Sequence, residues 1–599
     1  MVTKLLSRTF EMFLSWAVIA GLASRCLSAT YDKPDDVPNV DWDFIIVGGG
    51  TAGSVLASRL SENSQFNVLV LEAGPTNQNV TDSIIPGLQI KLANSRYDWN
   101  YTTVPQQGLN NRSVALERGY ILGGSSSVNG MVYTRGSSSD YNRFAEHSGD
   151  PGWGWDNIRQ YLRKHEKFED PVDNHNTTGQ YDPAVHSTTG RVPVTLFGFP
   201  HPQLDSLAIQ ASEQLGGEFQ YNVDMNSGTP LGLGWVQSTI GHGGTRSSAA
   251  TTYLDDEARA RKNLHIVTNS RVTRVLPEPD TEALTIRTVE VRVSETSNPI
   301  NFTASKEVIL SGGTIGTPFI LIHSGIANAE DLQEFGIKPL SDNPSVGRNL
   351  SDHSAFVVTF DVAPNSLGSG HWANLYSDPT LQAEALQIWN KNRTGPFVEP
   401  IPFGHLAWTR LANNITEKYG DPSSGTNSAH LEFMFGTTSP TAYNIVPIVV
   451  SPASRGTLTI GSNNPFEEPM IDLGFYTSDF DLAAAREALK SAFAFASAPV
   501  FQNVITGVAA PFTNATTESE IDDILRNITE SGLHPVGTAS MSPKGVSWGV
   551  VDPDLTVKNV TGLRVVDASV MPFVPCAHTQ VATYIIAERA ADLIRSAWE

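Results

Sequence analysis

Apolar residues near the start of the chain form two short runs separated by a helical pattern. The run Asp43-Phe-Ile-Ile-Val-Gly48 is continuous and rich in β-branched residues, which predicts a strand buried on both faces, as in a parallel sheet. Residues 52–60 predict a helix, and residues 67–71 predict a second buried strand. Two parallel strands joined by a helix make a βαβ unit, so the pattern indicates an α/β fold.

Three glycines at the first strand-to-helix turn point to a nucleotide cofactor. Gly48, Gly50 and Gly53 form G-x-G-x-x-G, and Glu72 follows the second strand about twenty residues further on. In this arrangement the glycines allow a tight turn, close approach to a pyrophosphate and close helix packing, and the acid binds a ribose. The pattern predicts dinucleotide binding of the Rossmann type and leaves NAD and FAD both open.

Similar elements recur far along the chain. Residues 118–130 form a glycine- and serine-rich loop, and Lys306 to Gly313 predict a strand that ends in a glycine pair, after which Thr317-Pro318 is expected to open a helix. Near the C-terminus, residues 562–567 predict a short strand and residues 579–597 an amphipathic helix.

Cofactor-type elements at both ends of the sequence predict a discontinuous domain. We expect residues 41–350 and 530–599 to form a Rossmann-like cofactor-binding domain. Residues 351–529 would then be an inserted α+β substrate-binding domain.

The first residues predict export from the cell. Lys4 and Arg8 precede an apolar run from Phe13 to Ala23, and small residues follow up to Ala29. This is the order of a secretory signal peptide, and the run is short for a membrane span. We expect residues 1–29 to be a signal peptide, with a signal anchor as the alternative.

Eleven N-x-S/T sequons support the secretory route and predict N-glycosylation. Asn349, within NPSVGRNLSDH, is expected to be buried and unglycosylated. The sequons lie at Asn79, Asn100, Asn111, Asn176, Asn301, Asn349, Asn392, Asn414, Asn514, Asn527 and Asn559.

Composition removes several classes of protein. The 599 residues suffice for a large core and carry a net charge of −22, which disfavours binding to nucleic-acid phosphates. Two cysteines, Cys26 and Cys576, exclude a disulfide scaffold, and cleavage after residue 29 would leave Cys576 alone. No spacing typical of metal ligands is present, so we expect no metal, no nucleic-acid partner and no stable membrane association.

Taken in order, the motifs resemble those of the glucose–methanol–choline (GMC) oxidoreductases. The resemblance runs from about Asp41 to Ile594 through DFIIVGGGTAG with LEAG, GGSSSVNGMVYTRG, EVILSGGTIGTP, NPSVGRNLSDH, LHPVGTASM with VDPDL, and HTQ. Within the family the chain is most similar to fungal aryl-alcohol oxidases, with pyranose dehydrogenases close behind. The resemblance implies FAD as cofactor. It implies FAD contacts from Gly48, Gly50, Thr51, Ala52, Gly53, Glu72, Gly123, Gly124, Ser125, Asn129, Gly130, Val272, Gly312, Asp567, Ala568, Thr579, Gln580 and Val581.

Two of the fourteen histidines match the family's catalytic pair. His534 lies in LHPVG and His578 in AHTQ, and each would be a structural histidine if the resemblance failed. An imidazole titrates near neutral pH, so His534 is the expected base for the hydroxyl proton, worth roughly 10²–10⁴ in rate. His578 would hydrogen-bond the developing alkoxide while hydride passes to flavin N5. The N-terminus of the last helix, at Thr579 to Val581, would stabilise negative charge on the flavin.

Several positions depart from the family pattern. Val128 stands where some members attach FAD to a histidine, so FAD is expected to be non-covalent. Gly130 and Leu533 stand where aryl-alcohol oxidases carry tyrosine and phenylalanine, and Leu533 is expected in the substrate pocket. The loop expected after Phe435, GTTSPTAYN, is shorter than theirs.

The sequence therefore predicts a secreted, glycosylated FAD-dependent oxidoreductase. Its expected reaction converts a primary alcohol, which could be an aromatic one, to an aldehyde, and the electron acceptor is O2 or a quinone. One alternative is a pyranose-type sugar dehydrogenase that uses quinones. A second is a hydroxynitrile lyase in which FAD is structural. A binding or storage glycoprotein is a third, and the intact His534/His578 pair argues against it. The oligomeric state stays open.

Overall fold

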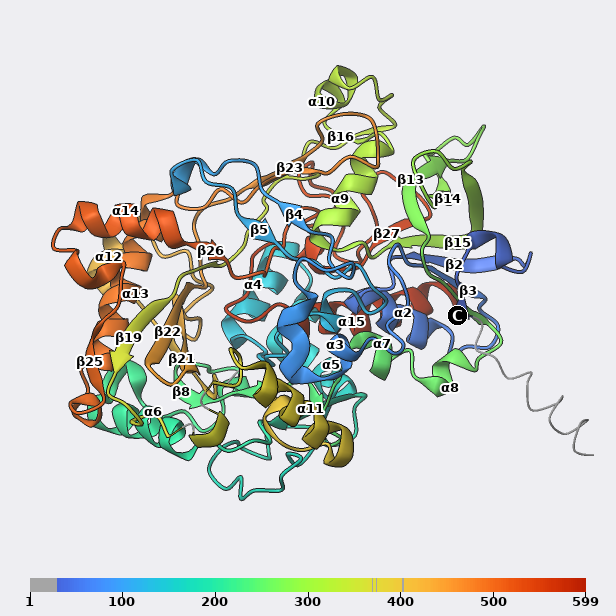
Figure 1. Cartoon of the computed structure of the whole chain (residues 1–599). Helices are drawn as coiled ribbons and strands as arrows, with labels where there is room; N and C mark the ends of the chain where they lie inside the picture. Colours follow the sequence, from blue (N-terminus) through green and yellow to red (C-terminus); the bar gives the residue numbers. More distant parts are fainter. Residues whose placement is uncertain (1–29, 369, 373, 401–402) are drawn as a thin grey trace, which may run out of the picture.

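The computed structural model describes residues 30–599 except 369, 373, 401 and 402. The predicted signal peptide and Cys26 lie outside this range. Figure 1 shows N-terminal strands, the C-terminal helix α15 (Gln580–Trp598) and the strands around residue 300 gathered on one side of the molecule. Residues between about 350 and 530 lie mostly on the other side, beside the residues around 205–235.

The first side is built on an eight-stranded sheet. Its central strand is β2 (Trp42–Val47), flanked by β3 (Val68–Leu71) and β15 (Ile300–Leu310), all parallel. The sheet continues through β12 (Leu264–Val267) to β1 (Thr30–Tyr31) on one side, and through the antiparallel β14 (Ile286–Arg292) and β13 (Arg271–Pro277) on the other. β27 (Leu563–Val565) adds to β15 in parallel, so a strand from the C-terminal segment joins this sheet.

The predicted elements agree closely with those observed at this end. The βαβ unit consists of β2, α2 (Thr51–Leu60) and β3, and the last helix is α15, which packs against α2. One prediction is wrong: α9 (Gly313–His323) begins four residues before Thr317, and Pro318 lies inside it. Pro318 cannot donate to the carbonyl of Thr314, and that carbonyl accepts from the Thr538 hydroxyl at 2.6 Å instead.

A second eight-stranded sheet dominates the other side. Its strand order is β25 (Ile505–Val508), β19 (Val358–Val362), β22 (Ala442–Val449), β21 (Leu431–Ser439), β20 (His405–Thr409) and β8 (Gly232–Trp235). The short strand β18 (Ser354–Ala355) joins β22 to β26 (Glu530–Ser531). β8 lies in the segment that the sequence assigned to the cofactor domain, yet it pairs with β20 in the second sheet. The second sheet therefore also contains strands from outside residues 351–529.

The segment after Phe435 is a hairpin instead of the expected loop. β21 continues to Ser439 and pairs with β22, which begins at Ala442. The remaining helices pack around the two sheets: α3 (Thr81–Ile84), α4 (Ser138–Ser148), α5 (Trp155–His165), α6 (Pro202–Leu215), α7 (Ala249–Thr252), α8 (Asp256–Arg259), α10 (Ala329–Glu334), α11 (Pro379–Asn392), α12 (Asn413–Tyr419), α13 (Asp479–Ala496) and α14 (Glu518–Ile528).

A buried ion pair ties the C-terminal strand to the sheet. Arg564 on β27 binds both carboxylate oxygens of Glu307 on β15, at 2.7 and 2.8 Å, and both side chains are less than a tenth exposed. The indole N–H of Trp598, at the end of α15, donates to the same carboxylate at 2.7 Å. These contacts hold the C-terminal strand and helix to a strand from the middle of the sequence.

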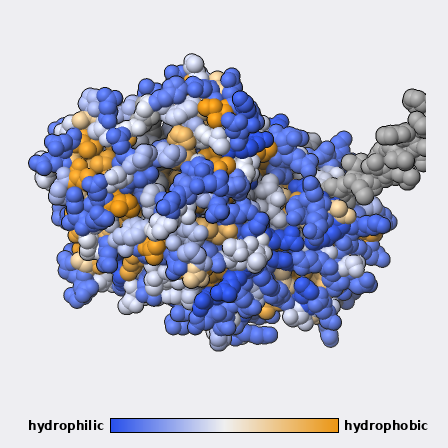
Figure 2. All heavy atoms as spheres, turned by 90° about the horizontal axis from the view of Figure 1, so that it is seen from below, coloured by the Kyte–Doolittle hydropathy of each residue, from blue (hydrophilic) through white to orange (hydrophobic). Residues whose placement is uncertain are grey.

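The sequon asparagines differ in their exposure. Every one is exposed except Asn349, which is half-buried and not buried as expected. Its side-chain amide donates to Ser540 and Pro572 and accepts from Arg455. Figure 2 shows a face covered mainly by hydrophilic residues, with apolar atoms scattered among them. Within the described part of the chain, no helix is both long enough and apolar enough to span a bilayer.

Candidate active site

A cavity of about 420 Å³ extends from the ends of β2 and β3 to Met434 on β21. It brings together residues that are hundreds of positions apart in the sequence. His534, His578 and Leu533 line it. So do most of the predicted cofactor residues: Gly48, Gly50, Thr51, Ala52, Glu72, Gly124, Ser125, Asn129, Gly130, Val272, Gly312, Asp567, Ala568, Thr579 and Gln580.

Three predicted cofactor residues lie behind the wall of this cavity. A Cβ on Gly53 would lie 1.9 Å from the Gly48 carbonyl oxygen, and one on Gly123 would lie 2.3 Å from Ser127 Oγ. Val581 is fully buried within α15. These residues shape the wall by close packing and do not form its surface.

The cavity has the features that a dinucleotide requires. The N-termini of α2 and α15 both reach it, and the first-turn N–H groups of a helix have no partner within the helix. A Cβ on Gly50 would meet only the Cα of Gly124, at the van der Waals distance of 3.8 Å, so no side chain covers this part of the turn. The backbone can therefore approach a phosphate closely, and the residues present fit FAD.

Glu72 is held in place by the glycine loops on either side of it. Its two carboxylate oxygens accept from the backbone N–H groups of Gly49, at 2.8 Å, and Gly74, at 2.7 Å. Burial raises the pKa of Glu72 to about 7, against these two hydrogen bonds. Each carboxylate oxygen keeps a second lone pair, which can accept a hydrogen bond from a ribose hydroxyl.

A buried arginine, Arg246, holds the side chain of Asn129, which lines the cavity. The Asn129 amide donates to Gln580 at 3.1 Å, and its oxygen accepts from Arg246 at 2.7 Å. Burial lowers the pKa of Arg246 to about 9. Asp567, which also lines the cavity, accepts from the Gly313 N–H and the Thr317 hydroxyl.

The two predicted catalytic histidines lie side by side at the second-sheet end of the cavity. Their ring centroids are 4.5 Å apart and the rings are inclined by 65°. His578 Nε2 lies 2.8 Å from the carboxylate of Glu432, a fully buried residue on β21. Among the described residues, none hydrogen-bonds His578 Nδ1.

His534 has a different partner. Its Nδ1 lies 3.0 Å from Nδ1 of His353, which is fully buried. Burial, followed by the neighbouring charges of His578, His353 and Arg118, holds the pKa of His534 well below its ordinary value. No described residue binds His534 Nε2. One nitrogen from each ring is thus free to meet a substrate.

Sequence reasoning did not assign His353 or Glu432 a role. The motif NPSVGRNLSDH contains His353, so that signal was present. Glu432 lies in a strand of mostly apolar residues, and one carboxylate there gives no pattern that predicts its contact with His578.

Three of the positions that depart from the family pattern, Val128, Gly130 and Leu533, border the cavity. Val128 and Gly130 line it, and a Cβ on Gly130 would meet no described atom within 4 Å. Leu533 has a left-handed backbone, with φ of 63°, and its carbonyl accepts from Arg118 at 2.7 Å. The cavity is therefore open where a larger side chain at position 130 would narrow it.

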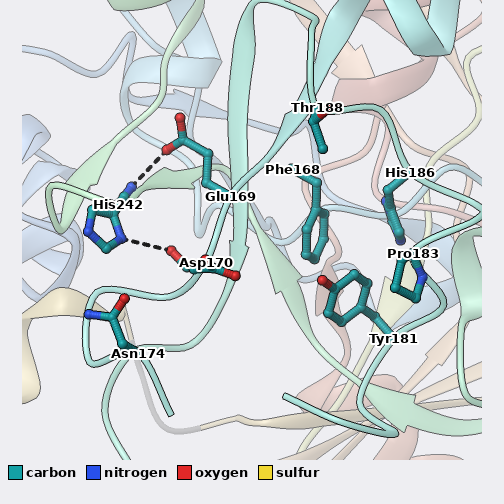
Figure 3. Close-up of a pocket in the computed structure, with 9 residues that line it drawn as sticks. All are labelled: Phe168, Glu169, Asp170, Asn174, Tyr181, Pro183, His186, Thr188 and His242. Carbon is teal, nitrogen blue, oxygen red and sulfur yellow. Dashed lines mark hydrogen bonds between the residues drawn. The ribbon is translucent and has the colours of Figure 1, made fainter. Parts of the chain in front are cut away.

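A second cavity, of about 560 Å³, contains none of the predicted site residues. Figure 3 shows Phe168, Tyr181 and His186 on one side of it, and His242 beside Glu169 and Asp170 on the other.

His186 is buried beside this second cavity, between two carboxylates, Glu166 at 2.8 Å and Asp224 at 2.7 Å. Burial alone would lower the pKa of His186, but the hydrogen bonds to Asp224 and Glu166 outweigh it and raise the pKa. Arg135 completes the ion pairing at 2.6 Å from Glu166.

Metal ligands and the cysteine thiol are the other groups to consider. No group of three or more His, Cys, Asp or Glu residues there could hold a metal ion. Cys576 is free and buried, and burial raises the pKa of its thiol.

Comparison with known proteins agrees with the geometry. Two models of the family described as GMC oxidoreductase match residues 42–355 and 452–587. Pyranose dehydrogenase of Agaricus campestris is 42% identical over 98% of this chain and 99% of its own length. Pyranose dehydrogenase 3 of Leucoagaricus meleagris is 42% identical over 95% of each.

Solved structures are also similar. A formate oxidase of Aspergillus oryzae is 28% identical, with a TM-score of 0.84 over 94% of this chain and 99% of its own. A fungal aryl-alcohol oxidase is 25% identical, with a TM-score of 0.82 over 93% of this chain and 99% of its own.

Proposed function

Because the chain belongs to the GMC oxidoreductase family, and is thus an FAD-dependent oxidoreductase acting on CH–OH donors, we propose that its substrate is a pyranose sugar and its acceptor a quinone. The observation that carries the proposal is the pair of free imidazole nitrogens, on His534 and His578, at the end of the cofactor cavity. Oxidation of a primary alcohol, aromatic in one version, is the second candidate.

The open space at Gly130 favours the sugar. Aromatic side chains that would narrow the entrance are missing at Gly130 and Leu533, and nothing lies within 4 Å of a Cβ at position 130. A pyranose ring with its hydroxyl groups is bulkier than a flat aryl alcohol and needs such room. The identity of 42% to pyranose dehydrogenases, against 25% to the aryl-alcohol oxidase, supports the same choice.

We propose that FAD occupies the cavity with its pyrophosphate at Gly48–Gly53 and the N-terminus of α2, its ribose at Glu72, and its ring near Asn129, Thr579 and Gln580. Bound FAD would accept a hydride from the substrate carbon. Val128 has no nucleophilic atom, so the proposed attachment is non-covalent.

The chain's own residues would then move one proton. Nε2 of His534 takes the proton of the sugar hydroxyl while the C–H hydride leaves, so that the alcohol becomes a carbonyl. In the proposed step both nitrogens of His578 donate, Nδ1 to the developing alkoxide and Nε2 to Glu432 at 2.8 Å, so the ring acts as an imidazolium paired with that carboxylate. Two fixed contacts on one oxygen orient the reacting carbon.

The route of the protein through the cell is also a proposal. The exposed sequons support N-glycosylation after export, and the engaged amide of Asn349 supports a bare side chain there. We propose a secreted glycoprotein with a cofactor-binding part at 41–350 and 530–599 and a substrate-binding part at 351–529.

A panel of sugars and alcohols tests the substrate proposal. The purified protein is mixed anaerobically with each compound, and the loss of the oxidised flavin band is followed. We expect pyranoses to bleach the band faster than aryl alcohols. Faster bleaching by aryl alcohols would favour the second candidate.

Two further measurements separate the remaining alternatives. Turnover with a quinone should exceed peroxide release with O2 for a dehydrogenase. Cyanohydrin cleavage without bleaching by any sugar or alcohol would identify a lyase instead.

A further inference from the structure

We infer that His353 is a positioning residue that sets the tautomer of His534. In this arrangement His353 Nδ1 accepts a hydrogen bond from the Nδ1–H of His534, so the lone pair of His534 lies on Nε2, toward the cavity. The inference rests on the proposed function, in which His534 is the base.

A backbone bridge lies beside the two histidines. Ser351 and Val536, which belong to no named strand, exchange both backbone hydrogen bonds, at 3.0 and 2.9 Å. His353 and His534 lie two residues beyond this bridge on the two antiparallel segments, so the bridge brings their backbones close together. Farther along, Ser354 pairs with Ser531, so the two extra residues, Gly532 and Leu533, bulge out between the paired positions.

Asp352 holds the backbone of both histidines. One carboxylate oxygen accepts from the N–H of His353 and from the N–H of His534, each at 2.8 Å. The other oxygen accepts from the Ser531 hydroxyl. The Gly532 N–H donates to the His353 carbonyl at 2.7 Å. These hydrogen bonds fix the backbones of both histidines, and so they hold the two Nδ1 atoms 3.0 Å apart.

Both rings are neutral, so only one hydrogen lies between the two Nδ1 atoms. Burial, followed by the charge of His578, lowers the pKa of His353 to about 3, and the pKa of His534 is lowered as well. Of two facing Nδ1 atoms, one must carry hydrogen and the other a lone pair.

The proposed role of His534 decides which ring donates. No described residue binds its Nε2, and the side chain lines the cavity, so a base there needs its lone pair on Nε2 and its hydrogen on Nδ1. His353 Nδ1 must then accept that hydrogen. The hydrogen of His353 lies on its own Nε2, which is buried and has no hydrogen-bond partner in the described part of the chain.

The opposite tautomer would disable the base. If His353 donated, His534 would carry its hydrogen on Nε2 and could not take a hydroxyl proton there. In the arrangement we infer, Nε2 gains the proton and the Nδ1–H stays bound to His353. That bond then becomes charge-assisted, and such bonds are stronger. The benefit arises as the proton moves, so it affects the rate of reduction more than the binding of the sugar.

Two substitutions of His353 test the inference. His353→Asn places an amide oxygen where Nδ1 lies and keeps an acceptor, and His353→Leu fills similar space without one. The limiting rate of flavin reduction and the substrate Kd are measured anaerobically. We expect His353→Leu to slow reduction about 10- to 100-fold with little change in Kd, and His353→Asn to stay within about threefold of wild type. Bound FAD and the unfolding temperature identify a variant that has not folded.

A direct measurement on the wild-type holoenzyme keeps the test independent of folding. NMR of isotope-labelled histidine, with His534 assigned from a His534→Ala sample, should show hydrogen on Nδ1 of His534. Hydrogen on Nε2 instead, or equal rates in the two folded His353 variants, would overturn the inference. A His534→Ala protein that reduces its flavin normally would overturn the proposed base itself, which is a different failure.

Discussion

Replacing His534 by alanine removes the proposed base and leaves the rest of the cavity unchanged. A general base contributes roughly 10²–10⁴ in rate. At 1.36 kcal/mol per decade, this is a loss of about 2.7 to 5.4 kcal/mol in transition-state stabilisation. We therefore expect flavin reduction by a good substrate to slow by at least about a hundredfold.

The structure also bounds the effect on stability. The substitution leaves buried His353 Nδ1 without its partner, 3.0 Å away in the wild type, which costs about 1–3 kcal/mol. The cofactor contacts proposed at Gly48–Gly53 and Glu72 do not involve His534, so the variant should retain FAD. A catalytic loss in a protein that is still folded and yellow is the expected result.

Single-turnover reduction is the appropriate assay, because steady-state turnover can be limited by flavin reoxidation or product release. His578→Asn is the matched control: it keeps a polar side chain of similar reach, so we expect a milder effect. The reasoning is refuted if flavin-replete His534→Ala reduces within about threefold of wild type, well below the hundredfold minimum for a base. A larger loss in His578→Asn would exchange the roles of the two histidines.

Three other predictions address the cofactor, the pH response and the ion pair between Arg564 and Glu307. With Val128 at the attachment position, acid precipitation should release FAD into the supernatant, and flavin in the pellet would contradict this. The folded-state pKa of His186 is raised, so its contribution to stability is full below its unfolded value, about 6.5, and is lost as pH rises through the folded value. The difference in unfolding temperature between wild type and His186→Gln should therefore shrink with rising pH, and a constant difference would argue against it. Arg564→Met should destabilise by about 3–5 kcal/mol in denaturant unfolding, and adding Glu307→Gln should recover part of that loss; purely additive effects would mean that the pair is not coupled.

Local patterns determined the cofactor half of the protein. The continuous apolar strand at 43–48, the three glycines and Glu72 are close in sequence, and their spacing follows from helix and strand geometry, so β2, α2 and β3 were predicted almost to the residue. Local rules failed at Pro318, because the Thr538 hydroxyl takes the freed carbonyl and lets the helix start earlier. They also failed after Phe435, where pairing with β22 turned an expected loop into strand.

What only the tertiary structure decided is how the histidines are held. His534 and His578 were recognisable from their motifs, but their partners come from segments far away in the sequence: Glu432 from β21, and His353 from beside the backbone bridge between Ser351 and Val536. A hydrogen bond between two side chains 181 residues apart depends on how these segments pack in the folded chain and not on the residues on either side of each histidine. The sequence determined which groups carry the chemistry, and the packing of the two sheets decided which nitrogen of each ring is free to do it.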